Sequence, residues 1–536
     1  MKTLFNECLA VLCRTGDALS LVSHLPGEVQ EKCLEWLTSH DQLVDVDSAR
    51  QPASSLSRNL RLFGNNLTRL VFFLSDQLND ALLIALARVN RRLEEVAIVY
   101  CPKVTNEGLY SVTVGQKYLR SLDLRGLTQL SGQGLEGVCS EALDAADLSD
   151  NPRLDSNALL RFVIKNPNIR HLCLNRCRRL DDLALFTIES LLGQQLITLE
   201  LDCLPSVQDP FGSLSALAAK CSQLRQLSLC RYFGFLEPST DASSLSRTVA
   251  SIQCCSLSRL DLLGNYFTSL PALPASLSEI RLSCNGTEDS EALAERLNRL
   301  AKLTSIELTL SCRDAGQPSV EQANRFLQLL LEDIGDRLRT LQMQLYHVHD
   351  RTMRVAASRC AATLTSLSID AIRANPISLQ NLLLSFINTD SRMSLRCLKI
   401  SRLHLTYKSV FKLARSAAEL EELELSQMVS RLDDRFLLLL ARSCPSGARP
   451  LQLRSLNLNG CPKVTDVGLC ALARRCPRLK EVRVRGTAAT DRSLRALAQF
   501  CPELEWLAHA DYTQQPGFSA GALQALRDSC VQRLIC

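Results

Sequence analysis

The sequence lacks the features of secreted, membrane and zinc-binding proteins. Its 536 residues contain no basic start followed by an apolar run, and no stretch approaches the ~18 apolar residues of a membrane span. The 23 cysteines are odd in number and form no C-x-x-C pair, which argues against a disulfide framework or a zinc site. We therefore expect free thiols in a soluble intracellular protein, located in the cytoplasm, the nucleus or both.

Histidine and excess charge are also scarce. The seven histidines are scattered and offer no catalytic constellation. His347 and His349 have no third metal ligand nearby in the sequence and are expected at the surface. The net charge of +5 is small for this length and does not indicate nucleic acid binding. The sequence thus predicts a protein that is not an enzyme and holds no metal or cofactor.

Leucine, by contrast, recurs in a fixed pattern. Leu453, Leu456 and Leu458 have the spacing of a short strand with one buried face. Cys461 closes the following turn, and the apolar residues of 469–473 fall at helical spacing. Because one strand and one helix cannot bury an apolar face alone, such units must stack, and the strands then form a long curved surface.

Copies of this L-x-x-L-x-L unit fill most of the chain. Their starts lie within the roughly 20–29 residue period of leucine-rich repeats, and about sixteen or seventeen copies are expected. The first clear copies begin at Leu93, Leu119, Leu143, Ile169, Leu196 and Leu224. The predicted fold class is an α/β leucine-rich-repeat solenoid, a horseshoe, over residues 61–536, with a small N-terminal helical module. Irregular spacers are expected at 231–255 and 309–337.

The second irregular spacer predicts a helix. Ser319 and Gln322 have the spacing of a capping box at its start. Phe326, Leu327 and the leucines of 329–331 would supply its apolar face.

One glycine motif resembles a dinucleotide fingerprint. The segment 132–137 reads G-x-G-x-x-G after an expected strand. However, Gly134-Leu135 occupies the same slot as Gly108-Leu109 and Gly468-Leu469, where we expect glycine to open the helix of each repeat. The repeat is the better explanation.

Residues 1–40 lie outside the repeat and predict a helical module, with 41–60 as a linker. Leu4, Cys8 and Leu12 recur every four residues and line one side of a first helix. Pro26 suits the first turn of a later helix, with Val29, Cys33 and Trp36 or Leu37 on its inner face. The module is also consistent with a simple cap over the apolar edge of the first repeat.

Several motifs resemble those of ubiquitin ligase receptors. The stretches Cys101-Pro-Lys-Val-Thr and Cys461-Pro-Lys-Val-Thr resemble the cysteine-containing repeats of F-box leucine-rich-repeat proteins. Thr3-Leu4-x-x-x-Cys8-x-x-x-Leu12 resembles the BC box that docks substrate receptors on elongin C. Leu25-Pro26-x-x-Val29-x-x-x-Cys33 resembles the cullin-2 box that follows it.

This resemblance implies a substrate receptor of a cullin-RING ubiquitin ligase. Leu4, Cys8 and Leu12 would bind elongin B/C, whereas the contacts with cullin-2 would come from Leu25, Pro26, Val29 and Cys33. The segment from Leu25 also resembles the first half of an F-box, which would use the Skp adaptor and cullin-1. A scaffold or inhibitor that acts without any ligase remains a further alternative.

A protein substrate is expected on the concave side, because the residues between the strand leucines point there. Trp506 is a candidate hot spot, although packing under a C-terminal cap would explain it equally well. The predicted substrate-binding residues are Arg120, Asp123, Arg125, Arg170, His171, Glu422, Glu424, Arg483, Arg485 and Trp506.

Overall fold

The computed structural model describes residues 25–39, 67–233, 256–265, 273–284, 290–310, 317–374, 381, 395–402, 419–427, 432–442, 450–509, 518–529 and 533–535. The chain forms two compact units. Among the described residues, the N-terminal unit holds those from 25 to 280 and the C-terminal unit those from 281 to 535.

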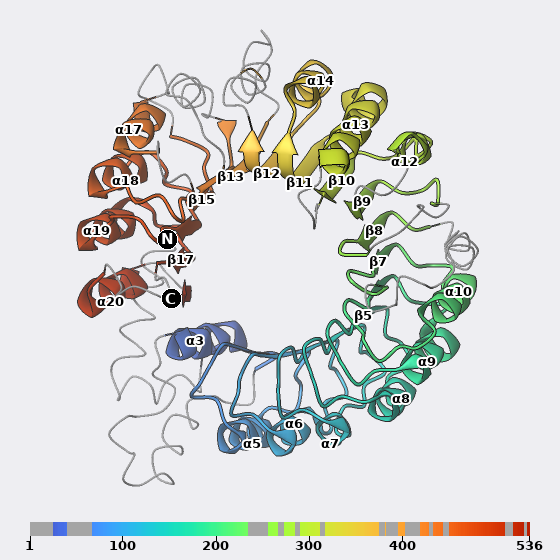
Figure 1. Ribbon diagram of the computed structural model, residues 1–536. Coiled ribbons are helices and arrows are strands. Elements are labelled where there is room, and N and C mark those ends of the chain that lie inside the picture. Colours follow the sequence, from blue (N-terminus) through green and yellow to red (C-terminus); the bar gives the residue numbers. More distant parts are fainter. Residues whose placement is uncertain are drawn as a thin grey trace. The chain divides into compact units, whose positions relative to one another are not determined.

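In the N-terminal unit, short strands alternate with helices, and each strand pairs in parallel with the next (Figure 1). The strands are β1 (Arg69–Phe73), β2 (Glu95–Val99), β3 (Ser121–Asp123), β4 (Ala145–Asp147), β5 (His171–Cys173), β6 (Thr198–Glu200), β7 (Gln226–Ser228) and β8 (Arg259–Leu262), and β9 (Glu279–Cys284) lies at the unit boundary. The helices are α3 (Gly27–Ser39), α5 (Asp80–Val89), α6 (Asn106–Thr113), α7 (Gly132–Leu135), α8 (Ser156–Lys165), α9 (Asp182–Leu192) and α10 (Pro210–Lys220).

The C-terminal unit repeats this arrangement with parallel pairing from each strand to the next. The strands are β10 (Ser305–Leu310), β11 (Thr340–Val348), β12 (Ser366–Ala374), β13 (Cys397–Ser401), β14 (Glu422–Ser426), β15 (Ser455–Asn457), β16 (Glu481–Arg483), β17 (Trp506–Ala508) and β18 (Arg533–Ile535). The helices are α12 (Ser290–Asn298), α13 (Gln317–Ile334), η3 (Gly335–Arg337), α14 (Asp350–Cys360), α17 (Asp434–Arg442), α18 (Asp466–Ala473), α19 (Asp491–Phe500) and α20 (Ala520–Ser529).

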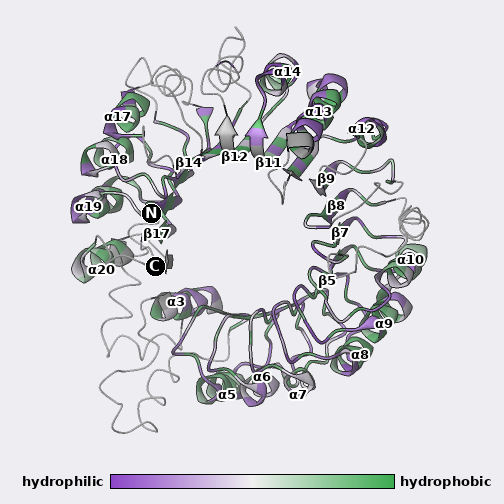
Figure 2. Cartoon of the chain, in the orientation of Figure 1, coloured by the Kyte–Doolittle hydropathy of each residue, from purple (hydrophilic) through white to green (hydrophobic). Residues whose placement is uncertain are grey.

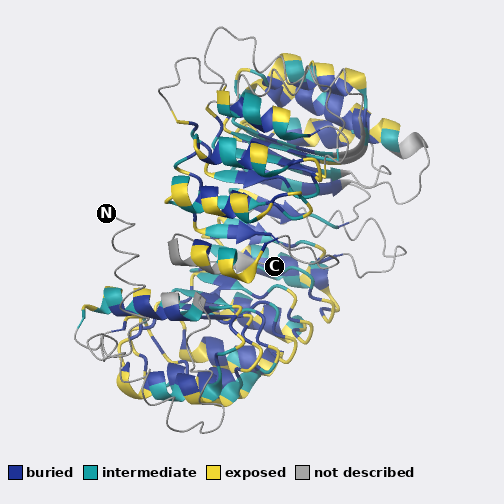
Figure 3. Ribbon diagram, turned by 90° about the vertical axis from the view of Figure 1, so that its left-hand side faces the viewer, coloured by how far each residue is buried: buried dark blue, intermediate teal, exposed yellow. Residues whose placement is uncertain are grey.

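The core of each unit lies between its strands and its helices, where buried residues gather (Figure 3). In β5, the Leu172 side chain is buried between half-exposed His171 and Cys173, which is the alternation that the repeat predicts. The helices are hydrophobic on one side and hydrophilic on the other, as α19 illustrates (Figure 2). The predicted strand leucines are buried in both units, which confirms the α/β leucine-rich-repeat solenoid.

The turn after several of the strands is held by a buried Asn or Cys side chain. The Asn151 amide donates to the carbonyl of Leu124 at 2.9 Å, and its oxygen accepts from the Leu127 amide at 3.0 Å. The Cys177 thiol donates to the carbonyl of Leu148 at 3.1 Å. Because these bonds join consecutive repeats, they satisfy backbone groups that would otherwise be buried without a partner.

Several helix starts are bonded to the helix of the preceding repeat. The Thr465 amide donates to Asp434 Oδ1 at 2.8 Å, and the Thr490 amide donates to Asp466 Oδ1 at 2.9 Å. A Cβ atom added to Gly468 would lie 2.6 Å from Asp434 Oδ1. The sequence predicts that Gly468 opens α18. This is wrong, because the helix begins at Asp466. Glycine is needed there for the close approach of the neighbouring helix.

Two other expectations need correction. The helix in 309–337 exists, but α13 begins at Gln317 instead of being capped by Ser319. Pro318 is accommodated in the first turn because a helix does not use the amide hydrogen there. In its expected apolar face Phe326 and Leu327 are buried, whereas Leu329 is half-exposed.

The repeat also extends beyond the copies found in the sequence. β1 precedes the first clear copy, with Leu67, Leu70 and Phe72 buried at the repeat spacing. This copy does not match the L-x-x-L-x-L pattern, because Phe72 takes the place of its third leucine. At the other end, β18 pairs with β17.

Candidate functional site

Helix α3 is the described part of the N-terminal module, and it packs on the first strand of the N-terminal unit. The Glu31 carboxylate accepts from the amides of Thr68 and Arg69, both at 2.9 Å, and from the Thr68 hydroxyl at 2.8 Å. On α3 itself, the side chains of Cys33 and Leu37 are buried. α3 thereby covers the edge at which the stack of strands begins.

The predicted cullin-contacting residues are divided by this packing. Pro26 is exposed and directly precedes α3, and its carbonyl accepts from the Val29 amide at 2.9 Å. Leu25 and Val29 are half-exposed, whereas Cys33 has no exposed surface. The predicted adaptor contacts Leu4, Cys8 and Leu12 lie outside the described residues.

The strand face is the surface made by the outward side chains of the strands in each unit. At its margin in the N-terminal unit, Arg170 Nε lies 2.5 Å from Asp144 Oδ1, and Arg120 Nε lies 3.8 Å from Glu94 Oε2. These pairs join neighbouring repeats. His171 is half-exposed and shares a hydrogen bond of 3.0 Å with Thr198 Oγ1.

Arg125 is the central cation of this face. Its guanidinium contacts Asp123 at 2.7 Å and Asp147 at 3.3 Å. The hydrogen bond with Asp123 raises the pKa of Arg125, and burial raises the pKa of the Asp147 carboxyl above its usual value. Asp147, which the sequence reading did not single out, is thus part of the same cluster as the predicted Asp123 and Arg125.

A second cluster of side chains joins the turns that follow these strands. The Tyr100 hydroxyl donates to Asp150 Oδ2 at 2.6 Å, and Arg176 also contacts that carboxylate. Tyr100 reaches Asp150 across Gly126, where any Cβ atom would overlap the tyrosine ring. The backbone of Tyr100, Gly126, Asp150 and Arg176 is left-handed, with φ between 52° and 70°.

Further along this face the acidic side chains have hydrogen-bond donors as partners. Asp202 accepts from the Ser228 hydroxyl at 2.6 Å and from the Cys230 amide at 2.8 Å. Burial nevertheless raises the pKa of the Asp202 carboxyl. Glu200 accepts from Asn175 at 2.7 Å. The sequence pattern does not predict these contacts, because the donors Asn175 and Ser228 lie in the repeats before and after that of the two acids.

In the C-terminal unit, the predicted residues of the strand face form two groups. In the first, Glu422 lies 3.2 Å from Lys399 Nζ and accepts a hydrogen bond from the Cys397 thiol at 3.2 Å. Burial opposes ionisation of Glu422, but the bonds from Cys397 and Lys399 outweigh it and lower the pKa of this carboxyl. Glu424 accepts from the Ser426 hydroxyl.

The second group contains the predicted aromatic residue. The Arg483 guanidinium lies 4.5 Å from the centre of the Trp506 ring, a cation–π contact between adjacent strands. Trp506 is half-exposed, and the small Ala508 is opposite Arg483 in the strand register. The Arg485 amide donates to Asn459 Oδ1 at 2.9 Å. Trp506 therefore packs against Arg483 and keeps part of its surface exposed.

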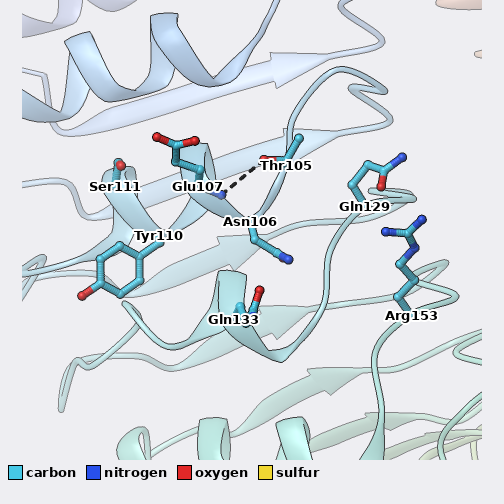
Figure 4. A pocket seen from close by; sticks show the side chains of 8 residues that line it. All are labelled: Thr105, Asn106, Glu107, Tyr110, Ser111, Gln129, Gln133 and Arg153. Atoms are coloured by element: carbon cyan, nitrogen blue, oxygen red, sulfur yellow. Dashed lines mark hydrogen bonds between the residues drawn. The ribbon is translucent and has the colours of Figure 1, made fainter.

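The helix side of the N-terminal unit has a shallow polar hollow of about 470 Å³ (Figure 4). It lies over α7, which has only 4 residues beside the longer α6 and α8. Its lining residues are Thr105, Asn106, Glu107, Tyr110, Ser111, Gln129, Gln133 and Arg153. Gly134 is buried against Asn106, so the G-x-G-x-x-G segment serves helix packing.

The described residues contain no group of three or more metal-ligating side chains. The rings of His347 and His349 are 5.3 Å apart, and both residues are half-exposed. Among all the residues that the structure describes, no helix is long and apolar enough to cross a membrane.

No family model matches the chain. Similar solved structures include Rad7 in complex with Elc1 from yeast, at 18% identity over 73% of this chain and 83% of that chain, with a TM-score of 0.42. TLR13 in complex with ssRNA13 matches at 16% identity over 86% of this chain and 60% of that chain, with a TM-score of 0.41. The leucine-rich-repeat protein LegL7 of Legionella pneumophila matches at 16% identity over 64% of this chain and 98% of that chain, with a TM-score of 0.34. At these values the similarities carry no functional assignment.

Proposed function

We propose that this chain is a non-catalytic substrate receptor of a cullin-RING ubiquitin ligase in the cytoplasm or nucleus. Its N-terminal module docks on elongin B/C and cullin-2, and its strand face binds the target protein. Leu4, Cys8 and Leu12 contact elongin C through the motif that resembles a BC box. Ubiquitin transfer is performed by other subunits.

The observation that carries this proposal is the position of α3. The helix begins directly after Pro26, within the segment that resembles a cullin-2 box, and Glu31 anchors it to the first strand. A docking module joined rigidly to the repeats would hold a bound target at a fixed distance from the ligase. In this arrangement Leu25, Pro26 and Val29 contact the cullin, while buried Cys33 holds the helix on the stack.

The strand face supports the second half of the proposal. Arg125 and Arg483 are each held in place by a neighbouring repeat, through ion pairs or through Trp506. Arginine and tryptophan are enriched among the residues that dominate binding energy, and fixed side chains lose less entropy when a partner binds.

Affinity purification from cells tests the docking. We expect the wild-type chain to recover elongin B/C and cullin-2, and the double variant Leu4→Ala with Cys8→Ala to lose both at least tenfold. Loss of the apolar side chains removes the contacts that the motif provides. Unchanged recovery by a double variant that remains folded would sink the proposal, and recovery of the Skp adaptor with cullin-1 would favour the F-box alternative.

A second candidate function is a free-standing repeat scaffold or inhibitor. The complete burial of Cys33 favours it, because this side chain, which the resemblance assigns to the cullin, is already used to hold the helix over the edge of the stack. In that case neither adaptor is recovered with the wild-type chain, while target proteins are still bound. Pro26→Ala with Val29→Ala would then leave the set of partners unchanged.

A further inference from the structure

The strands β2 to β9 all begin with the same pair of hydrogen bonds. Two successive amides at the start of the strand donate to one carbonyl oxygen, that of the residue directly before the neighbouring strand. The amides of Glu94 and Glu95, for example, donate to the carbonyl of Thr68 at 2.7 and 3.1 Å. The residues whose carbonyls accept such a pair are Thr68, Glu94, Arg120, Asp144, Arg170, Ile197, Arg225 and Ser258. The pair thus ties each strand to the one before it and satisfies its first amides.

Strand β1 receives the same pair of bonds from a side chain. No strand precedes β1 in the described part of the chain, and α3 lies at its start instead (Figure 1). Glu31 Oε1 accepts from the amides of Thr68 and Arg69, both at 2.9 Å. The Thr68 hydroxyl donates to the same oxygen at 2.8 Å. A carboxylate oxygen of α3 therefore takes the position that a backbone carbonyl oxygen takes in the following repeats.

The bonds of Glu31 determine how α3 is turned on the stack. The buried side chains of Cys33, Leu34 and Leu37 select the side of the helix that faces the repeats, but apolar packing has no preferred direction. Hydrogen bonds are directional, and those with an ionised acceptor are stronger than neutral ones. Three donors on one oxygen of Glu31 therefore fix the rotation of α3 and its position along β1.

The proposed contacts with the cullin move with this helix. Pro26 is exposed directly before α3, and Val29 is half-exposed two residues before Glu31. The strand face of the same unit begins at β1, whose amides hold Glu31. Glu31 thus lies on the shortest covalent and hydrogen-bonded path between the proposed docking contacts and the proposed target-binding face.

We infer that Glu31 is a positioning residue, which sets the orientation of α3 and its docking contacts relative to the strand face of the N-terminal unit. The effect on ubiquitin transfer rests on the proposed function, whereas the placement of α3 does not. Transfer depends on bringing a lysine and the ubiquitin-bearing subunit together in the right geometry, so a helix that is free to turn lowers or redirects it.

Hydrogen exchange of the full chain, followed by mass spectrometry, tests the placement. In Glu31→Ala the amides of Thr68 and Arg69 should exchange at least tenfold faster, because they lose a charged acceptor. Glu31→Gln keeps a side-chain oxygen at the same position and should retain most of the protection. Glu35→Ala is the matched control. It removes the same charge from the same helix, but Glu35 pairs with Lys32.

A ligase reconstituted from the full chain, elongin B/C, cullin-2 and the RING subunit tests the consequence. The probe is ubiquitin attached to the chain itself, at the exposed Lys103, Lys117, Lys165 and Lys220 of the N-terminal unit. Glu31→Ala should recover cullin-2 within twofold of the wild type. The relative rates of modification at these lysines should change at least fivefold, and the Gln variant should restore the wild-type rates.

Three results of the exchange experiment would overturn the inference. They are unchanged exchange in Glu31→Ala, equally fast exchange in Glu31→Gln, and an equal effect of Glu35→Ala, which would attribute the protection to charge alone. Circular dichroism verifies that each variant is folded. If Glu31→Ala unfolds, Glu31→Asp takes its place, since its shorter side chain withdraws the oxygen from the amides.

The ligase experiment separates this inference from the proposed function. Unchanged relative rates at the lysines, with cullin-2 recovered by Glu31→Ala, would overturn the role of Glu31 in transfer. Failure of the wild-type chain to recover elongin B/C and cullin-2 would refute the proposed function instead. The exchange of Thr68 and Arg69 would then still decide whether Glu31 positions α3.

Discussion

At the scale of single residues, the turn after each strand constrains its side chains most tightly. The left-handed backbone there is occupied by glycine at 126 and by non-glycine residues such as Tyr100, Asp150 and Arg176. Such a conformation costs a side-chain-bearing residue of the order of 1 kcal/mol. At Asp150 the cost is offset by hydrogen bonds with Tyr100 and Arg176, which join three repeats.

Gly126→Ala is predicted to destabilise the protein by roughly 2–3 kcal/mol, since it adds backbone strain and also displaces the Tyr100 ring. Gly115→Ala is the matched control. Gly115 has a similar φ of 78° but no atom within 4 Å of an added Cβ, so this change should cost about 1 kcal/mol. Urea unfolding measures both, and equal costs would show that the Tyr100 contact is irrelevant.

At the scale of elements, the helices of the C-terminal unit are joined through their first turns. Asp434 accepts from Thr465, Asp466 accepts from Thr490, and Asp491 accepts from Ser519. Each carboxylate thus stabilises the start of the next helix in addition to the start of its own. This recurrent acid at the beginning of a helix fixes the spacing between helices.

Asp466→Asn is predicted to lower the free energy of unfolding near neutral pH. The free energy of unfolding of this variant should also fall less steeply as the pH is lowered. Burial raises the pKa of Asp466, but hydrogen bonds from Ser493 and Thr490 outweigh it and leave the pKa lowered. A lowered pKa contributes stability that is present above the unfolded value of about 4 and is lost as the pH falls through the folded value. Thermal unfolding between pH 2 and 7 measures this. Glu503→Gln, which removes an acid without a hydrogen-bond partner among the described residues, should leave the profile unchanged.

At the scale of the whole molecule, each repeat contacts mainly its neighbours in the stack. In the N-terminal unit, β5 pairs with β4 and β6 only, and α9 packs on α8 and α10. Stability in such a stack is approximately a sum of local terms. A change in one repeat is therefore felt most strongly in the repeats beside it.

Leu172→Ala is predicted to cost about 2–5 kcal/mol, because the side chain is fully buried. Hydrogen exchange followed by mass spectrometry should show lost protection in 145–200 and little change in 450–509. The exposed Ile164→Ala is the control and should change neither region. Equal loss of protection along the whole chain would contradict the local coupling of the repeats.

Some features could be predicted from sequence because they repeat. Spacing alone predicts Leu456 and Leu458 in the core and Cys461 in the turn, and all three side chains are buried there. The pairing of Asp434 with Thr465 was missed, since the partners are distant in sequence and belong to different repeats. For the same reason the contact of Asp147 with Arg125 could not be predicted.

The sequence by itself determined the fold, because burial of one leucine face per repeat is a local and periodic requirement. It also located a separate N-terminal module and a face for target binding, both of which remain predictions. Only the tertiary structure decided which side chains are available. It buried Cys33, paired Arg125 with two acids, placed Arg483 over Trp506 and left Phe186 exposed. Availability depends on contacts between neighbouring repeats, and those contacts form only when the repeats stack.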